Sequence, residues 1–169
     1  SGTGNLAYSA ALDQFVAMDS ILTEKSKGLS ITRQYFKPSP RYYQTYEERN
    51  LGNQVGSCKV NDVILVRLTI QSDRTLEYMM LDDYIPAGFE VIDQGQIDYW
   101  DWHYWWSDRD VRDDRVSFYL ESLSKGKRTV EYQMRAISKG TYHALPAAVW
   151  AMYQPTLRSA TAERGFEVR

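Results

Sequence analysis

The stretch that most constrains the fold runs from residue 128 to residue 155, RTVEYQMRAISKGTYHALPAAVWAMYQP. In its first half, apolar Val130, Tyr132, Met134 and Ala136 alternate with polar or charged side chains. Strict alternation over ten residues predicts a strand with one buried face and one solvent-exposed face. A turn is expected at 138–140, because Gly140 can adopt positive φ without steric cost.

The second half of this stretch, residues 141–153, is apolar almost throughout. Such a run predicts a second strand that is covered by protein on both faces. The strand is expected to stop at Pro155, which has no N–H to donate to a sheet ladder. Two long strands joined by a tight turn are therefore the element around which we expect the other strands to pack.

Other strand-like runs are short and are separated by turn signals, and no helical pattern of useful length follows residue 28. These runs are 29–36, 62–71, 75–81, 89–92, 116–120 and 166–169. Their spacing predicts an all-β chain, an antiparallel β-sandwich of seven to eight strands in which consecutive strands pair as hairpins.

Length and charge exclude several classes of protein. A chain of 169 residues is long enough for one domain with a real core. A net charge of −2 gives no electrostatic support for a nucleic-acid partner, and the apolar runs are too short for a transmembrane segment. Because Cys58 is the single cysteine, neither an internal disulfide nor a zinc cluster is expected. No metal and no other cofactor is predicted.

The N-terminal part of the chain has a different character. Ser1 and Gly2 resemble the remnant of a tag, and residues 1–27 follow neither a helical nor a strand period. We interpret 1–27 as the tail of a preceding domain with a linker, and 28–169 as the β-sandwich domain.

The acidic pairs and the two histidines are weak candidates for chemistry. The pairs are Glu47–Glu48, Asp82–Asp83 and Asp113–Asp114, and the histidines are His103 and His143. Adjacent carboxylates on a strand point to opposite faces, so they do not converge on one site. The histidines lack metal-ligand spacing and no nucleophile stands out beside them. We therefore predict structural roles, no catalytic residue and no enzymatic activity.

The most unusual composition lies between residues 99 and 106. Six aromatic side chains occur there: Tyr99, Trp100, Trp102, Tyr104, Trp105 and Trp106. Exposed rings of this kind bind sugars or peptides, which suggests a carbohydrate- or peptide-binding β-sandwich as an alternative function. The favoured interpretation is an insertion that folds onto its own domain and covers a sheet edge.

The order of four motifs resembles the C-terminal macroglobulin-like domain of the bacterial alpha-2-macroglobulin family, a receptor-binding-like domain. These motifs together span about residues 28–158. They are GLSITRQYF from residue 28, LDDYIPAGFE from 81, RDDRV from 112, and YQMRA from 132 with GTY from 140 and MYQP from 152.

The resemblance implies a macroglobulin- or immunoglobulin-like β-sandwich that is a non-catalytic domain of an endopeptidase inhibitor. Its partners would be the thioester-type domain of the same polypeptide and, through the complete protein, target proteases. Met152 and Tyr153 match the pair that docks on and shields the thioester. Cys58 is not followed by the family's C-x-E-Q, so it does not match the thioester cysteine. The parent protein is expected to be a periplasmic or cell-surface lipoprotein, anchored to the membrane outside this domain.

Overall fold

The computed structural model describes residues 24–38, 51–92 and 105–169, and every regular element in these ranges is a strand. None of these residues belongs to a helix of the length and apolar character that crossing a bilayer requires.

Fourteen strands make up the described part of the chain, and several have only two or three residues. They are β1 (Glu24–Lys25), β2 (Leu29–Lys37), β3 (Asn53–Gln54), β4 (Ser57–Cys58), β5 (Val63–Ser72), β6 (Leu76–Tyr84), β7 (Phe89–Val91), β8 (Asp108–Val111), β9 (Arg115–Leu123), β10 (Gly126–Ala136), β11 (Gly140–Ala144), β12 (Ala148–Ala151), β13 (Gln154–Ala160) and β14 (Arg164–Val168).

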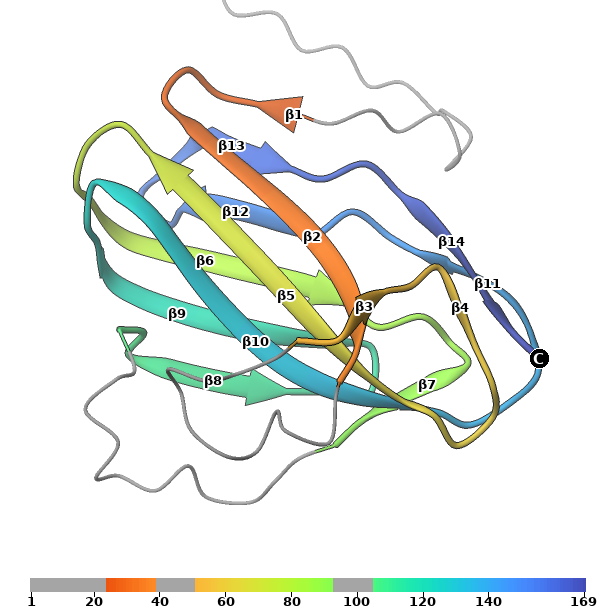
Figure 1. Cartoon of the computed structure of the whole chain (residues 1–169). Coiled ribbons are helices and arrows are strands. Elements are labelled where there is room, and N and C mark those ends of the chain that lie inside the picture. The colour runs from red at the N-terminus through yellow and green to blue at the C-terminus, as the bar shows by residue number, and fades with distance from the viewer. Residues whose placement is uncertain (1–23, 39–50, 93–104) are drawn as a thin grey trace, which may run out of the picture.

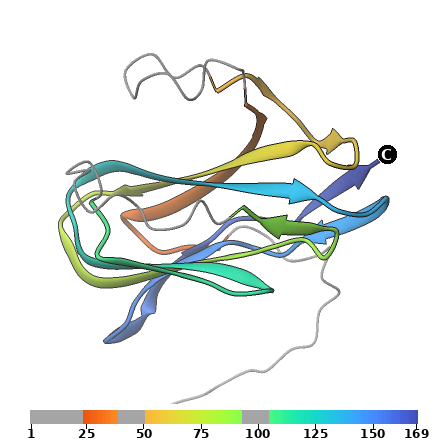
Figure 2. The ribbon, with the colours of Figure 1, turned by 90° about the horizontal axis from the view of Figure 1, so that it is seen from below.

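The strands form two facing sheets, as Figure 1 shows and as the edge-on view in Figure 2 makes plain. One sheet has the order β1-β13-β12-β6-β9-β8 and the other has the order β3-β2-β5-β10-β7. A smaller sheet, β11-β14-β4, lies at one end, and in it β14 pairs in parallel with β4. The all-β sandwich predicted from the sequence is therefore confirmed.

The centre of the five-stranded sheet is β5, which pairs antiparallel with both β2 and β10. Its ladder with β10 runs in unbroken register from Ser72 opposite Gly126 to Val63 opposite Arg135. The run VILVRLTI explains this position, because a β-branched, apolar strand packs well where it has neighbours on both sides.

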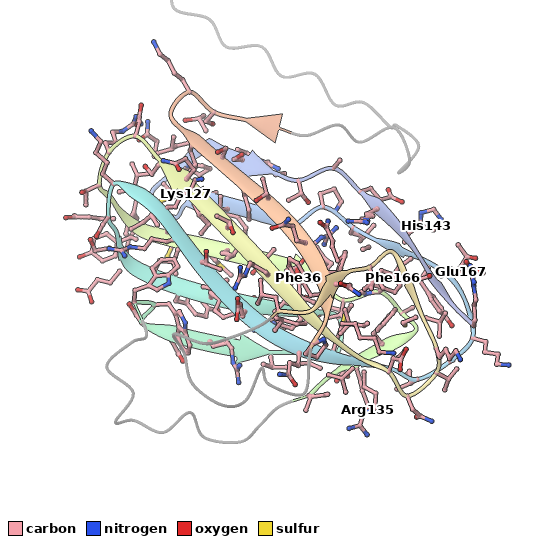
Figure 3. All side chains as sticks on the ribbon, viewed as in Figure 1. Phe36, Lys127, Arg135, His143, Phe166 and Glu167 are labelled. Atoms are coloured by element: carbon pink, nitrogen blue, oxygen red, sulfur yellow. The ribbon has the colours of Figure 1, made fainter. Side chains whose placement is uncertain are left out.

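The core fills the space between the two sheets and closes on aromatic side chains at one end. Tyr35 and Phe89 both contact the ring of Phe166 edge-on, each at 5.2 Å between centroids. Figure 3 labels Phe166 on β14, at the end of the sandwich where the three-stranded sheet lies. The short C-terminal strand therefore covers this end of the core.

The prediction that residues 128 to 153 form a hairpin is wrong. β10 pairs with β5 and β7, whereas β11 pairs with β14. The expected second strand is divided into β11 and β12, which belong to different sheets. Pro146 lies in the break between them, where it lacks a backbone donor and cannot continue a ladder.

Two further expectations about this region also differ from the structure. Consecutive strands pair as hairpins at β2–β3, β8–β9 and β12–β13, but β5 to β6 and β9 to β10 pass from one sheet to the other. Pro155 does not end a strand, because it lies within β13. The passages from β5 to β6 and from β9 to β10 follow from long-range packing and leave no local signal in the sequence.

Candidate docking surface

The turn between β12 and β13 presents Met152 and Tyr153 to solvent. Ala151 pairs with Gln154, so the two residues form the tip of a tight turn. Their exposed fractions are 45% for Met152 and 82% for Tyr153. Both side chains therefore lie on the surface, as a docking or shielding role requires, and neither contributes to the core.

Tyr78 on β6 holds this tip in place. Its carbonyl accepts a hydrogen bond from the backbone N–H of Met152 at 2.9 Å. Its ring meets the ring of Tyr153 edge-on, with 5.5 Å between centroids and 80° between planes. Edge-to-face pairs of this kind are worth about 0.5–1.5 kcal/mol beyond the area that they bury, so the turn rests on a defined support.

The backbone of Tyr78 is unusual for a residue inside a strand. Its φ is +53°, in the left-handed region that a bulky side chain seldom occupies. This conformation interrupts the alternation of β6, so that Glu77 and Tyr78 are both exposed between buried Leu76 and Met79. Opposite them on β9, Glu121 and Ser122 are likewise both exposed, between Leu120 and Leu123.

These outward-turned residues line a hollow of about 350 Å³. Its lining consists of two carboxylates, three aromatic rings and two hydroxyls, from Glu77, Tyr78, Trp105, Trp106, Ser107, Glu121 and Ser122. Since Tyr78 borders the hollow and also contacts Tyr153, the hollow and the Met152–Tyr153 turn form one continuous surface. We call this surface the Tyr153 face.

Two of the six aromatic residues singled out in the sequence, Trp105 and Trp106, lie in the described part of the chain and are partly buried. The indole Nε1 of Trp105 donates a hydrogen bond to the carbonyl of Thr129 at 2.9 Å. Trp106 contacts Phe118 edge-on, with 5.8 Å between centroids. Both rings thus fold onto their own domain. The other four, Tyr99, Trp100, Trp102 and Tyr104, lie outside the described residues.

Comparison with known proteins identifies the family to which this sandwich belongs. Residues 28–156 match the family described as the bacterial alpha-2-macroglobulin MG10 domain. The chain belongs to this family. Among curated relatives, alpha-2-macroglobulin of Rickettsia conorii is 31% identical over 150 residues, which cover 81% of this chain and 7% of the relative. A Dictyostelium discoideum protein, circularly permutated Ras protein 2, is 28% identical over 166 residues, which cover 95% of this chain and 4% of the relative.

Solved structures of bacterial alpha-2-macroglobulins share the fold of this MG10 domain. Trypsin-activated alpha-2-macroglobulin from Escherichia coli superposes with a TM-score of 0.71 at 21% identity, over 88% of this chain and 11% of that one. The Salmonella protein reacted with methylamine gives a TM-score of 0.68 at 23% identity, over 88% of this chain and 10% of that one. The MG10 domain spans less than a tenth of the length of each of these two curated relatives.

The motifs of the resemblance meet in a buried ion pair that joins the two large sheets of the MG10 domain. Arg33 on β2 donates to Asp83 on β6 at 2.5 Å, and both side chains are almost fully buried. The hydroxyl of Tyr132 on β10 donates to the other carboxylate oxygen of Asp83 at 2.8 Å. The guanidinium of Arg33 also donates to the carbonyls of Ala144 and Leu145, so this buried charge is well satisfied.

Burial dominates the protonation of this cluster. It raises the pKa of the Asp83 carboxyl, although the charge of Arg33 and the hydrogen bonds from Tyr132 and Arg33 oppose that shift. Burial, and after it the charge of Asp83, also raises the pKa of Tyr132 well above its usual range. The phenol therefore keeps its proton and acts as a donor. These contacts give Asp83 a structural role in strand β6, as the sequence predicted for the Asp82–Asp83 pair.

The remaining candidates from the sequence do not converge on a site. Asp82 accepts a hydrogen bond from the hydroxyl of Ser117 within the sheet. Oδ1 of Asp114 lies 3.9 Å from Nε of Arg115. His143 pairs with Glu163. Burial raises the pKa of the Cys58 thiol to about 11, so neighbouring Lys59 does not activate it. Glu47, Glu48 and His103 lie outside the described residues, within which no group of acidic, histidine or cysteine side chains could hold a metal.

Among the residues of the Tyr153 face that the sequence did not single out are Glu77, Tyr78, Glu121 and Ser122. A signal for them exists, because LEYM from residue 76 and LESL from residue 120 each place two polar or amphipathic residues between apolar ones. This spacing of three interrupts the period of two that defines a flat strand. Two matching interruptions do not reveal that they face each other, since that depends on the register of β6 with β9.

Proposed function

We propose that this MG10 domain docks through its Met152–Tyr153 turn on the thioester-type domain of the same polypeptide and shields the thioester until a protease acts. The domain itself is non-catalytic in this proposal and belongs to an endopeptidase inhibitor. The supporting observation is the exposure of Tyr153, at 82%, on a turn that Tyr78 contacts through a backbone hydrogen bond and its ring. Burial of this large exposed ring against a partner surface would remove apolar area from water and stabilise the docked state.

The chemistry of the two side chains suits such a cover. A thioether and a phenol ring are bulky, carry no strong nucleophile at neutral pH, and exclude water from a reactive acyl group. Support for a reactive group in the family comes from the Salmonella alpha-2-macroglobulin, whose structure was solved after reaction with methylamine, a small nucleophile. The complete protein would act outside the cytoplasm, in the periplasm or at the cell surface, with its membrane anchor outside this domain.

The test is the reaction of the complete protein with methylamine, followed by mass spectrometry. In this reaction the amine nitrogen attacks the acyl carbon, an amide forms, and the cysteine sulfur leaves as a free thiol. We expect one methylamine and one new thiol per molecule. Tyr153→Ala should react roughly tenfold faster than the wild type before protease treatment, which corresponds to a loss of about 1.4 kcal/mol of protection.

Ile137→Ala is the matched control, because Ile137 is 47% exposed and lies in the link between β10 and β11, away from the turn. It should react at the wild-type rate. Equal rates for Tyr153→Ala and the wild type would contradict the shielding role. Absence of methylamine uptake before and after proteolysis would show that the protein captures nothing covalently, and the thioester part of the proposal would fail.

A further inference from the structure

The hollow on the Tyr153 face combines carboxylates that form no ion pair within the described part of the chain with aromatic rings that are held by contacts of their own. We propose that it receives a lysine or arginine side chain of the domain on which the Met152–Tyr153 turn docks. This inference rests on the proposed function, because it names the chemistry of the partner surface.

The backbone opens the hollow and orients its acidic groups. Glu77 pairs with Ser122 across β6 and β9, and Glu121 is the next residue along β9. The left-handed φ of Tyr78 interrupts the alternation of β6 beside Glu77. Glu77 and Glu121, from the two paired strands, are both exposed. A strained backbone that aims side chains at one point is common at binding sites.

The two carboxylates carry uncompensated charge. Neither Glu77 nor Glu121 forms an ion pair with a cation in the described part of the chain, whereas Glu131, Glu163 and Glu167 each pair with a basic side chain. Two like charges that border one hollow repel each other. A single cation placed between them would remove the repulsion and gain two attractive contacts.

The aromatic walls favour an organic cation. Trp105 is fixed by its hydrogen bond to Thr129, Trp106 by its contact with Phe118, and Tyr78 by its contact with Tyr153. Trp and Tyr faces attract ammonium and guanidinium groups, by about 0.5–2 kcal/mol depending on solvent exposure. Rings that are already ordered lose little entropy on binding. A volume of about 350 Å³ is also far larger than a bare metal ion needs, and it suits a long side chain.

The position of the hollow identifies which molecule supplies the cation. Tyr78 forms part of the wall and also contacts Tyr153, so a surface that covers the turn lies next to the hollow. The complete relatives are more than ten times longer than this domain, which leaves ample chain to provide such a surface. Charge complementarity then requires a basic residue opposite Glu77 and Glu121.

The test uses hydrogen exchange on the complete protein before any protease is added. The variant E77Q/E121Q removes both charges and keeps the side-chain volume, and E90Q/D113N is a charge-matched control on β7 and the β8–β9 turn. In E77Q/E121Q we expect amides of β6 and β9 next to the hollow to exchange roughly fivefold faster, as loss of a partly exposed ion pair allows. Raising the salt concentration should speed exchange in the wild type and in the control, but not in E77Q/E121Q.

A parallel variant, Tyr153→Ala, separates the two proposals, and a reversal of charge, Glu121→Lys, should accelerate exchange more than E77Q/E121Q does. If Tyr153→Ala speeds exchange at the turn while E77Q/E121Q and Glu121→Lys match the wild type, the hollow holds no cation and the docking proposal stands alone. If the hollow variants speed exchange and Tyr153→Ala does not, the cation comes from another surface and the docking proposal fails. Wild-type exchange in all variants would overturn both.

Discussion

At the scale of single residues, the MG10 domain depends on one buried charge cluster. Arg33, Asp83 and Tyr132 come from three strands and tie the two large sheets together across the core. Taking charges out of water is costly, and their mutual attraction repays this only when every partner is in place. A buried cluster of this kind therefore stabilises the fold little, but its partial removal is strongly destabilising.

Asp83→Asn should lower the free energy of unfolding by about 3–5 kcal/mol, because the guanidinium of Arg33 would remain buried without a counter-charge. Urea denaturation of this chain measures the change. Asp113→Asn, an exposed substitution in the β8–β9 turn, should change the unfolding free energy by less than about 0.5 kcal/mol. A double variant, R33M/D83L, should lose much less than the sum of its single variants. A loss below about 1 kcal/mol for Asp83→Asn would mean that the ion pair does not govern the core.

Cys58 should be almost inert to iodoacetamide in the folded protein. Because its pKa is about 11, very little of the thiol is ionised at pH 8. An ordinary cysteine, with a pKa near 8.5, is partly ionised at the same pH. Alkylation should be on the order of a hundredfold slower than in urea-unfolded protein, and the rate should rise as the pH approaches 11. Equal rates in folded and unfolded protein would show that the thiol is accessible and ionised.

At the scale of elements, motifs far apart in the sequence explain each other by contact. The turn that carries Gly88 packs against Tyr142 on β11, and a Cβ at position 88 would lie 2.1 Å from the Tyr142 ring. Phe89, the next residue, meets the same ring edge-on at 6.3 Å. The motifs PAGFE and GTY are therefore two halves of one packing contact.

Gly88→Ala should destabilise the domain by about 1–3 kcal/mol, because either the Tyr142 ring or the turn must move. Gly165→Ala is the control, since a Cβ there meets no atom within 4 Å, and it should leave the melting temperature nearly unchanged. Thermal unfolding by circular dichroism compares the two. Equal melting temperatures would show that the ring accommodates the methyl group without cost.

The same scale shows what the sequence could and could not predict. Strand positions could be predicted, because β10 shows local alternation and β5 is a nearly continuous apolar run. Strand partners do not, since β2, β5 and β10 meet only through the packing of distant segments. The break at Pro146 could have been recognised from its missing N–H. Met152 and Tyr153 were chosen by resemblance alone, because the apolar run before them gives no local sign of a turn.

At the scale of the whole molecule, the exposed apolar side chains of the MG10 domain gather on one face. Three of the four large apolar side chains that are exposed among the described residues, Tyr78, Met152 and Tyr153, lie together on the Tyr153 face. The fourth, Ile137, lies in the link between β10 and β11. An apolar patch beside an acidic hollow is the pattern of an interface with an anchoring ring and a polar rim.

The most direct measurement is photocrosslinking of the complete resting protein with benzoylphenylalanine in place of Tyr153. We expect a crosslink within the same polypeptide, to the thioester-type domain, which is lost after protease treatment. The same probe in place of Ile137 should not reach that domain. A crosslink from position 153 to any other domain, or none at all while the protein stays folded, would contradict docking through the Met152–Tyr153 turn.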